Sequence, residues 1–248
     1  MSKQERYSDY DSFAWIYDRY WSRAVPPQIL TVIDRLVVPR LPRGANVLDL
    51  CCGTGYTSAE LIKRGFKVTG LDGSKEMLRR ARRNAPRARM ILGDARSFDL
   101  PPVYGAVVST FDSLNHLMTL AELTAAFRNA YRSLAPSGLF LFDLIMEKGF
   151  LLHWVDYFAI VEEAEACILR GAYDREQRIG RYDITMFRRR GRMWRRTDAA
   201  ITEKCYTARE IRGSLKKAGF KEVSAYDAEK EMGLTEHVGR TFFLARKD

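Results

Sequence analysis

Three acidic residues, each at the end of a short apolar run, give this sequence its clearest chemical signal. Asp49 stands just before a turn that contains Gly53 and Gly55. Asp72 and Asp94 close the next two apolar runs along the chain. If these runs are neighbouring parallel strands, their carboxyl ends meet at one edge of a sheet, where ligands of open α/β sheets bind. The spacing therefore predicts a small-molecule site at that edge.

The glycine turn allows two interpretations. Gly53 and Gly55 permit a positive φ and a close backbone approach, as in the fingerprint that binds a dinucleotide. Two residues argue against a dinucleotide: Ser58 stands where the third glycine would fall, and the carboxylate of Asp49 would face an incoming pyrophosphate. A carboxylate at that position suits a cationic group better, such as the ammonium of an amino acid.

Asp72 and Asp94 would extend such a ligand to a nucleoside. An acidic side chain about 20 residues after the glycine turn can accept hydrogen bonds from both ribose hydroxyls. Asp94, within Gly93-Asp94-Ala95, could accept a bond from an adenine amino group. Taken singly, Asp72 could be a helix N-cap and Asp94 an ordinary loop residue. Their joint spacing is more specific than either residue.

The elements that would position these residues alternate between strands and helices. Thr119 with Glu122 forms a capping-box pattern before one of the helices. Strands that alternate with helices, joined by right-handed crossovers, predict a doubly wound α/β fold around a parallel sheet. The strands are expected at 47–50, 66–71, 88–92, 106–108 and 139–142, and the helices at 57–64, 74–84 and 120–134.

The alternation changes in the second half of the chain. From about 157 to 206 the residues alternate with period two, as in Tyr182, Ile184 and Met186. Arg190-Gly191 looks like a hairpin turn, so we interpret this stretch as an antiparallel insertion. The α/β pattern resumes with a second capping box, Thr207 with Glu210, which opens a helix at 207–219 that ends at Gly219. Two last strands are expected at 220–226 and 241–245.

The ends of these patterns suggest three parts. Residues 8–21 are expected to form a helix or ordered arm, and Pro26-Pro27 opens a further helix. We assign residues 1–40 to an N-terminal helical arm, 41–150 and 207–248 to the α/β core, and 151–206 to the antiparallel insertion.

Composition excludes several classes of protein. The chain has 248 residues, of which 46% are apolar, so it suits one domain with an insertion and is too apolar to be disordered. No apolar run reaches the roughly 18 residues of a membrane helix, and the polar start lacks the apolar stretch of a signal peptide. The four cysteines form no metal-like spacing with the three histidines. We expect a cytoplasmic protein with no metal and no membrane partner.

The stretches VLDLCCGTG, VTGLDGSKEML and ILGDA together resemble the motif series of class I S-adenosylmethionine-dependent methyltransferases. The resemblance covers residues 46–143 and 207–246 and implies that family's Rossmann-like, seven-stranded sheet with a reversed last strand. Two adjacent cysteines, Cys51 and Cys52, stand where the commonest motif has a small or acidic residue and one cysteine, which is a mild departure.

The resemblance also implies which residues hold the cofactor, S-adenosylmethionine, and its product, S-adenosylhomocysteine. Asp49 and the glycine turn would bind the methionine part, Asp72 the ribose, and Asp94 with Ala95 the adenine. The core residues expected at the cofactor are Asp49, Cys51, Gly53, Gly55, Asp72, Gly73, Met77, Asp94, Ala95 and Phe111.

The segment after the fourth strand, 109–117, is similar to that of N-methyltransferases acting on deoxyamino sugars. In those enzymes the matching histidine is the proposed general base, which implies that role for His116. Methyl transfer is an in-line displacement, and an amine must be neutral at nitrogen, so a base with a pKa of about 6.5 can help. His116 could instead merely pack against, or cap, the helix that starts near Thr119.

The arm and the insertion would enclose the site. The arm resembles the family's lid, in which Tyr10 matches a tyrosine at the methionine carboxylate and Tyr17 packs from the next turns of the helix. A plain amphipathic helix with an aromatic face explains the same pattern. In the resembling subgroup the insertion covers the acceptor pocket and often forms a homodimer contact. Its candidate pocket residues, which could equally be core, are Trp154, Tyr157, Phe158 and Trp194.

The net charge of +10 leaves RNA as an alternative acceptor. Arginines between 188 and 196 could track phosphates, and Trp194 could stack on a base. The insertion also contains acidic residues, and arginines at a hairpin tip are typical of a solvated edge that discourages strand pairing. We therefore favour a small-molecule acceptor, methylated at nitrogen rather than oxygen. A non-catalytic, cofactor-binding regulatory protein is a further alternative, which loss of site residues would suggest; none is lost.

Overall fold

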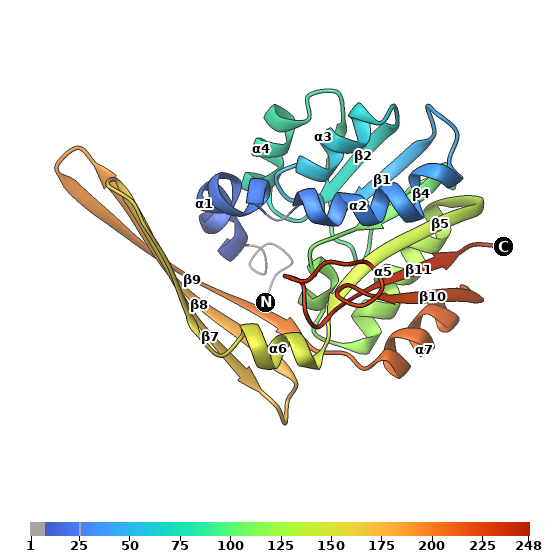
Figure 1. The fold of residues 1–248 in the computed structure, drawn as a ribbon. Helices are drawn as coiled ribbons and strands as arrows, with labels where there is room; N and C mark the ends of the chain where they lie inside the picture. Colours follow the sequence, from blue (N-terminus) through green and yellow to red (C-terminus); the bar gives the residue numbers. More distant parts are fainter. Residues whose placement is uncertain (1–7, 25) are drawn as a thin grey trace.

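The computed structural model describes residues 8–24 and 26–248. Its central sheet consists of β1 (Asn46–Leu50), β2 (Lys67–Asp72), β3 (Arg89–Leu92), β4 (Tyr104–Ser109), β5 (Leu134–Ile145), β10 (Glu222–Asp227) and β11 (Arg240–Arg246). The seven strands lie in the order β10-β11-β5-β4-β1-β2-β3 (Figure 1). The strands β1 to β5 are parallel to one another, and β11 is antiparallel to both of its neighbours, β10 and β5. The predicted doubly wound sheet with a reversed last strand is confirmed.

Helices cover both faces of this sheet and bury its apolar side chains. On one face lie α5 (Leu120–Ser133) and α7 (Ala208–Ala218), which pack on Phe140, Phe142 and Phe243. On the other lie α2 (Pro26–Leu36) and α3 (Tyr56–Lys63), which pack on Val47 and Val108. The helix α2 is therefore part of the core, although residues 1–40 were assigned to an arm.

The predicted helix ends are confirmed in part. The capping box that begins α7 is complete, because Thr207 and Glu210 each bond the other's backbone, and Gly219 ends the helix with a φ of 118°. At α5, Thr119 accepts from the amide of Glu122 at 3.2 Å, but the carboxylate of Glu122 accepts from the amide of Met118 at 2.9 Å instead. The Thr119 half of the predicted box is therefore confirmed.

A second sheet forms the predicted antiparallel insertion. Its strands, in spatial order, are β6 (Tyr157–Val161), β7 (Glu165–Asp174), β8 (Ile179–Arg190) and β9 (Met193–Lys204). The helix α6 (Glu147–His153) connects β5 to this sheet. The predicted turn after Arg190 is present, with Gly191 at a φ of 61°, and the β8–β9 hairpin projects beyond the rest of the molecule (Figure 1).

The helix α1 (Ser8–Ala24) lies between the second sheet and α4 (Lys75–Asn84) (Figure 1). Its apolar side chains Phe13 and Ile16 are buried against Cys167, Ile184 and Met186 of the insertion. The expected arm is thus an amphipathic helix whose apolar face is covered by residues more than a hundred positions away in the chain.

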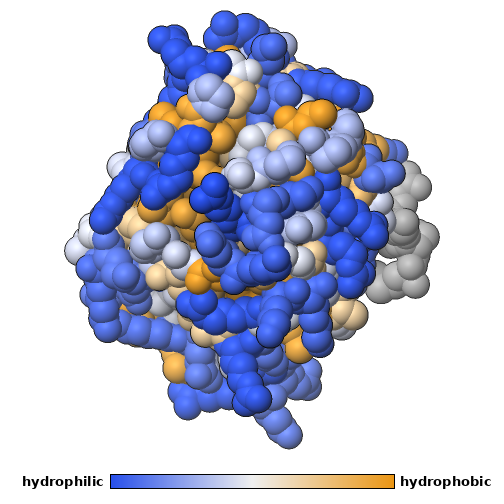
Figure 2. All heavy atoms as spheres, turned by 90° about the vertical axis from the view of Figure 1, so that its right-hand side faces the viewer, coloured by the Kyte–Doolittle hydropathy of each residue, from blue (hydrophilic) through white to orange (hydrophobic). Residues whose placement is uncertain are grey.

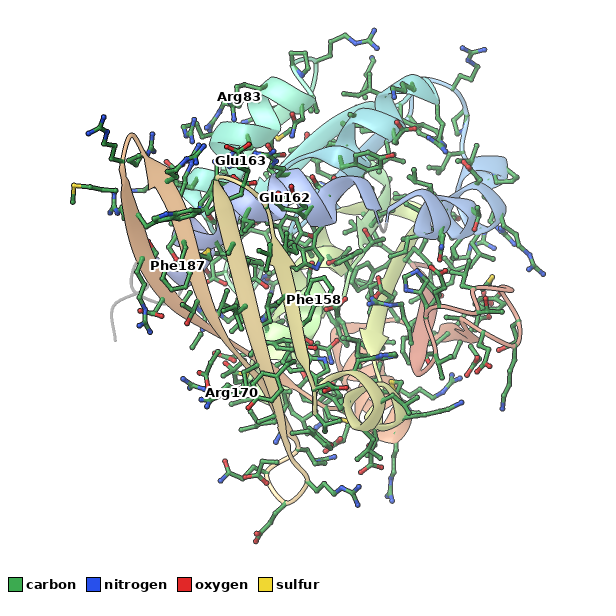
Figure 3. All side chains as sticks on the ribbon, turned by 60° about the vertical axis from the view of Figure 1, so that its left-hand side comes forward. Arg83, Phe158, Glu162, Glu163, Arg170 and Phe187 are labelled. Carbon is green, nitrogen blue, oxygen red and sulfur yellow. The ribbon has the colours of Figure 1, made fainter. Side chains whose placement is uncertain are left out.

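The face of the second sheet that points away from α1 is exposed to solvent. Figure 3 views this sheet and shows Glu162 and Glu163 at the end nearest α4, with Phe187 and Arg170 further along the strands. Ile168 on this face is 41% exposed. The homodimer contact expected through the insertion stays a prediction. The side of the molecule that carries β10 and β11 is mostly hydrophilic, with scattered hydrophobic patches (Figure 2). No helix in the described part of the chain is long and apolar enough to span a membrane.

Candidate active site

A cavity of about 710 Å³ lies at the carboxyl ends of the central strands, between the sheet, α1 and β9. Its volume is in the range of small-molecule sites, roughly 300–1,000 Å³. Gly55 and Asp94, two of the predicted site residues, lie outside the lining. The predicted site residues that line it are Tyr10, Tyr17, Asp49, Cys51, Gly53, Asp72, Gly73, Met77, Ala95, Phe111 and His116.

The turn after β1 uses left-handed backbone at three positions. Cys51, Gly53 and Gly55 have φ values of 61°, 52° and 79°. A Cβ atom on Gly55 would lie 2.9 Å from the backbone of Ala81, so this glycine is needed for the close packing of the turn against α4. Gly55 therefore has a structural reason to be glycine that is separate from ligand contact, and the left-handed Cys51 was not foreseen.

Asp49 is a buried carboxylate that faces the cavity. Its Oδ2 atom accepts a hydrogen bond from Ser58 Oγ at 2.6 Å, and its side chain is 2% exposed. Burial raises the pKa of Asp49 to about 7, although the bond from Ser58 acts in the opposite direction. Ser58, which argued against a dinucleotide in the sequence, thus orients the carboxylate that would meet a cationic ligand.

Asp72 connects the glycine turn to the next helix. It accepts from the amide of Gly53 at 2.8 Å and from the amide of Ser74 at 2.9 Å. The N-cap of α4 is Ser74, whose Oγ accepts from the amide of Met77, so Asp72 is not that cap. Each carboxylate oxygen can accept a second bond, which leaves acceptor capacity for the hydroxyls of a ribose. The ribose role stays a prediction.

Asp94 is turned toward a neighbouring cation rather than toward the cavity. Arg96 bonds both of its carboxylate oxygens, with Nε at 2.9 and 3.0 Å and Nη2 at 2.5 Å. The same guanidinium reaches Glu122 at 2.6 Å. The neighbours Gly93 and Ala95 do line the cavity, so this strand end contributes backbone and a methyl group to the wall.

The turn after β4 is held in an unusual conformation by a buried charge network. Phe111 and Asp112 both have left-handed backbone, with φ values of 72° and 51°. Their amides donate to the carboxylate of Asp143, which is fully buried, at 2.7 and 3.0 Å. Arg240 bonds both Asp143 and Asp112, the latter at 2.7 Å. This network fixes the cavity wall beside Phe111, and the sequence analysis missed all three of its charged members.

The helix α1 forms the roof of the cavity with residues at helical spacing. Tyr10, Phe13, Tyr17 and Trp21 all line it. The ring of Tyr17 stacks with that of Trp21 at 6.5 Å between centroids and meets the edge of Phe111 at 6.4 Å. The predicted aromatic face of the arm therefore lies over the site.

Two aspartates on the flank of α1, each directly after a lining tyrosine, attach this roof to α4. Asp11 accepts from Ser74 Oγ at 2.5 Å and from the amide of Glu76 at 3.1 Å, at the start of that helix. Asp18 meets Arg80 at 3.3 Å and accepts from Asn84 at 2.8 Å, at its end. The two contacts hold α1 along the length of α4.

His116 ends the short 3₁₀ helix η2 (Ser113–His116) and faces the roof. Its Nδ1 atom is 3.0 Å from the carbonyl oxygen of Thr202, and its Nε2 atom is 2.6 Å from the hydroxyl of Tyr10. A carbonyl only accepts, so Nδ1 carries a proton and the neutral ring presents the Nε2 lone pair to the cavity. Burial raises the pKa of Tyr10 above its ordinary value, which keeps its hydroxyl protonated as a donor to Nε2.

The aromatic residues of the insertion divide between the cavity and the surface. Trp154 lines the cavity, and so does Tyr182; their ring centroids are 4.3 Å apart. Tyr157, Phe158 and Trp194 do not line it and are 72%, 52% and 48% exposed. The expectation that these three contribute to the pocket is wrong, because Tyr157 and Phe158 lie on the edge strand β6 and Trp194 lies on the projecting β8–β9 hairpin.

Comparison with known proteins places this fold and cavity among methyltransferases. A family described as "Methyltransferase domain" matches residues 47–138. "Putative methyltransferase YqeM" of Bacillus subtilis is 30% identical over 249 residues, covering 96% of this chain and 97% of that protein. A dTDP-3-amino-3,4,6-trideoxy-alpha-D-glucopyranose N,N-dimethyltransferase of Streptomyces venezuelae is 38% identical over 107 residues, covering 43% of this chain and 45% of that protein.

A solved structure extends the similarity to nearly the whole chain. CalS10, described as an amino pentose methyltransferase from Micromonospora echinaspora with S-adenosylmethionine bound, is 26% identical and has a TM-score of 0.75. The match covers 94% of this chain and 97% of CalS10, so it includes the insertion as well as the central sheet.

Proposed function

Because this chain belongs to the class I S-adenosylmethionine-dependent methyltransferases, we propose that it methylates an amine nitrogen of a small-molecule acceptor. The observation that carries the proposal is the position of His116, whose Nε2 faces the cavity while Nδ1 is engaged by a carbonyl. That arrangement presents a proton acceptor, which an ammonium nitrogen needs before its lone pair can attack the methyl group.

The cofactor end of the cavity has the donors and acceptors that S-adenosylmethionine requires. Asp49 would hold the ammonium of the methionine part, and Asp72 the ribose hydroxyls. Met77 and Ala95 offer apolar surface to the adenine of the cofactor. When bound, S-adenosylmethionine supplies a methyl group made electrophilic by the positive sulfur.

Shielding from water and proton transfer depend on the protein's own side chains. Tyr10, Tyr17 and Phe111 line the cavity and would shield the reacting atoms from water. His116 would accept the proton of the acceptor's ammonium at Nε2, in place of the bond from Tyr10, and release it to solvent after the reaction. The protein otherwise contributes alignment, since an in-line displacement depends on the geometry of the reacting atoms.

The names of relatives support an amine as the acceptor. The Streptomyces venezuelae relative is a dimethyltransferase of an amino sugar, and CalS10 is an amino pentose methyltransferase. The sequence match to the former spans less than half of either chain, so its sugar nucleotide is not carried over to this protein.

A polynucleotide acceptor has less support. Several arginines of the insertion are engaged within the protein: Arg189 with Glu163 at 2.9 Å, and Arg196 with Asp198 at 2.9 Å. Arg188 lies over the ring of Trp15 at 4.9 Å. These pairs reduce the positive charge that phosphates would meet at the hairpin.

A transfer assay with matched acceptors tests the proposal. With methyl-labelled S-adenosylmethionine, 3-amino-3-deoxyglucose should take up label and glucose should not. The His116→Ala variant should lose about 100-fold in kcat with that amine, because it lacks the proton acceptor, and should bind S-adenosylhomocysteine as the wild type does. His153→Ala, an exposed histidine at the cavity, is the control and should keep its kcat. Label in glucose, or equal kcat for both variants, would contradict the proposal.

A further inference from the structure

Glu203, near the end of β9, is a buried carboxylate that points into the cavity. Its side chain is 4% exposed, and its Oε1 atom lies 3.4 Å from Nε2 of His116. Its Oε2 atom is buried and has no hydrogen-bond partner among the described residues. Buried polar atoms are nearly always paired in folded proteins, so an unpaired carboxylate oxygen at a cavity wall requires an explanation.

Another buried glutamate of the same sheet shows what a purely structural partner set is like. Glu165 on β7 is also 4% exposed, but it accepts from the hydroxyl of Tyr20 at 2.7 Å and pairs with Arg19 at 2.9 Å. Glu165 lies outside the cavity lining. The contrast indicates that Oε2 of Glu203 lacks a partner in the described structure because a ligand supplies it.

The charges around Glu203 favour a cation as that partner. Asp112 is within hydrogen-bonding reach of Glu203, and Asp143 adds a further negative charge. Arg240 is the only lysine or arginine among the described lining residues, and it is already bonded to both of these aspartates. Burial, and then Asp112, raise the pKa of Glu203, so a bound cation would stabilise its ionised form.

The other walls near this end of the cavity suit a cation with an apolar body. Trp154 and Tyr182 both line the cavity, and their rings lie 4.3 Å apart. Aromatic faces attract ammonium groups and pack against carbon skeletons. Glu203, His116 and these rings therefore line the same cavity.

We propose that Glu203 binds the protonated amine of the methyl acceptor through Oε2 and thereby selects amines over alcohols. This inference rests on the proposed function. The acceptor's N–H donates to Oε2, and the ammonium is then held on the His116 side of the cavity, where its proton passes to Nε2. Glu203 is a specificity-determining residue in this scheme, while His116 receives the proton.

A binding experiment tests the subsite without knowledge of the natural acceptor. The probes are benzylamine and benzyl alcohol, which have similar size and differ in charge. Their dissociation constants are measured by ligand-observed NMR at neutral pH, on protein saturated with S-adenosylhomocysteine. The wild type should bind benzylamine at least about tenfold more tightly than benzyl alcohol, because an ammonium–carboxylate hydrogen bond is charge-assisted.

The variant Glu203→Gln keeps the shape and removes the charge. It should bind benzylamine about tenfold more weakly than the wild type and benzyl alcohol equally well, whereas Glu165→Gln should keep the wild-type preference. Should the glutamine variant fail to fold, Glu203→Met gives the same comparison. Equal binding of the two probes by the wild type, or an unchanged preference in Glu203→Gln, would overturn the subsite.

Three further outcomes separate a failure of this inference from a failure of the proposed function. If Glu203→Gln lost about as much affinity for S-adenosylhomocysteine as for benzylamine, the residue would be assigned to the cofactor, which would also overturn the proposal. A preference for benzylamine that does not depend on Glu203, with label still entering 3-amino-3-deoxyglucose, would remove the subsite and leave amine methylation standing. Label entering glucose instead would remove the proposed function, whatever the probes show.

Discussion

The two ends of the cavity are built in different ways. At the cofactor end, the decisive bonds join residues that are close in the chain, such as Ser58 to Asp49, 9 positions apart, and Gly53 to Asp72, 19 apart. At the acceptor end, Tyr10 meets His116 across 106 positions and Arg240 meets Asp112 across 128. The first end is a local motif, and the second is assembled only when distant segments of the chain come together.

The ends also differ in how their charges are balanced. Asp49 and Asp72 are each stabilised by neutral donors and keep capacity for a ligand. At the acceptor end, Asp112 and Asp143 share one buried arginine, Arg240, which is 8% exposed. Removing one charge from that group leaves the others buried and unpaired, so the acceptor end should tolerate substitution less well than the cofactor end.

The largest effect is therefore expected from Arg240→Met. Loss of the guanidinium leaves the carboxylates of Asp143 and Asp112 without their counterion, which should lower the free energy of unfolding by about 3–5 kcal/mol. Urea denaturation followed by circular dichroism measures the change. Arg246→Met, at the exposed end of the same strand, is the control and should change stability by less than about 0.5 kcal/mol. A similar small change for Arg240→Met would show that the network does not stabilise the fold.

At the cofactor end, the next largest effect should come from Asp72→Ala. Its carboxylate holds Gly53 and is expected to bind the ribose, so affinity for S-adenosylhomocysteine should fall about 100-fold, measured by calorimetry. Asp94→Ala removes a strand-end aspartate that is paired with Arg96 outside the lining, and affinity should change less than about threefold. Equal losses in the two variants would restore the predicted contact between Asp94 and the adenine.

The smallest effect concerns the pH dependence of cofactor affinity. The pKa of Asp49 is about 7 in the ligand-free protein, so this group is mostly protonated at pH 6 and mostly ionised at pH 7.5. A carboxylate is needed to bind an ammonium, so S-adenosylhomocysteine affinity should rise about eightfold over this interval. Asp49→Asn should bind weakly and with no such rise; a rise that persists in the variant would assign the titration to another group.

The same raised pKa has a consequence for stability with the opposite sign. The folded protein holds a proton on Asp49 that the unfolded chain would release near its ordinary, lower pKa. This contribution to stability is therefore fully present below the unfolded-state pKa of 3.8 and is lost progressively as the pH rises to about 7. Comparison of the wild type with Asp49→Asn isolates it, because the amide does not titrate.

The central sheet, the helices around it, the insertion and most of the cofactor end could be predicted from the sequence alone. Those elements follow from local rules: apolar runs of strand length, capping residues such as Thr207, and glycines at left-handed turns. The cofactor motif lies on consecutive strands of a parallel sheet, and such strands must bring their carboxyl ends together. Spacing along the chain was therefore enough to place Asp49 and Asp72 at one edge.

The acceptor end could not be predicted in this way, because its residues come together only in the folded protein. A glutamate on the inward face of β9, in line with the buried Ala199 and Ile201, was a signal present in the sequence, but nothing there showed that His116 would lie beside it. The left-handed Phe111 likewise depends on Asp143 and on Arg240, which comes from the last strand. Similarly, the same local pattern allowed Asp94 to face either a ligand or Arg96. Contacts between distant segments depend on how the layers pack, and packing is not encoded in the periodicity of any one segment.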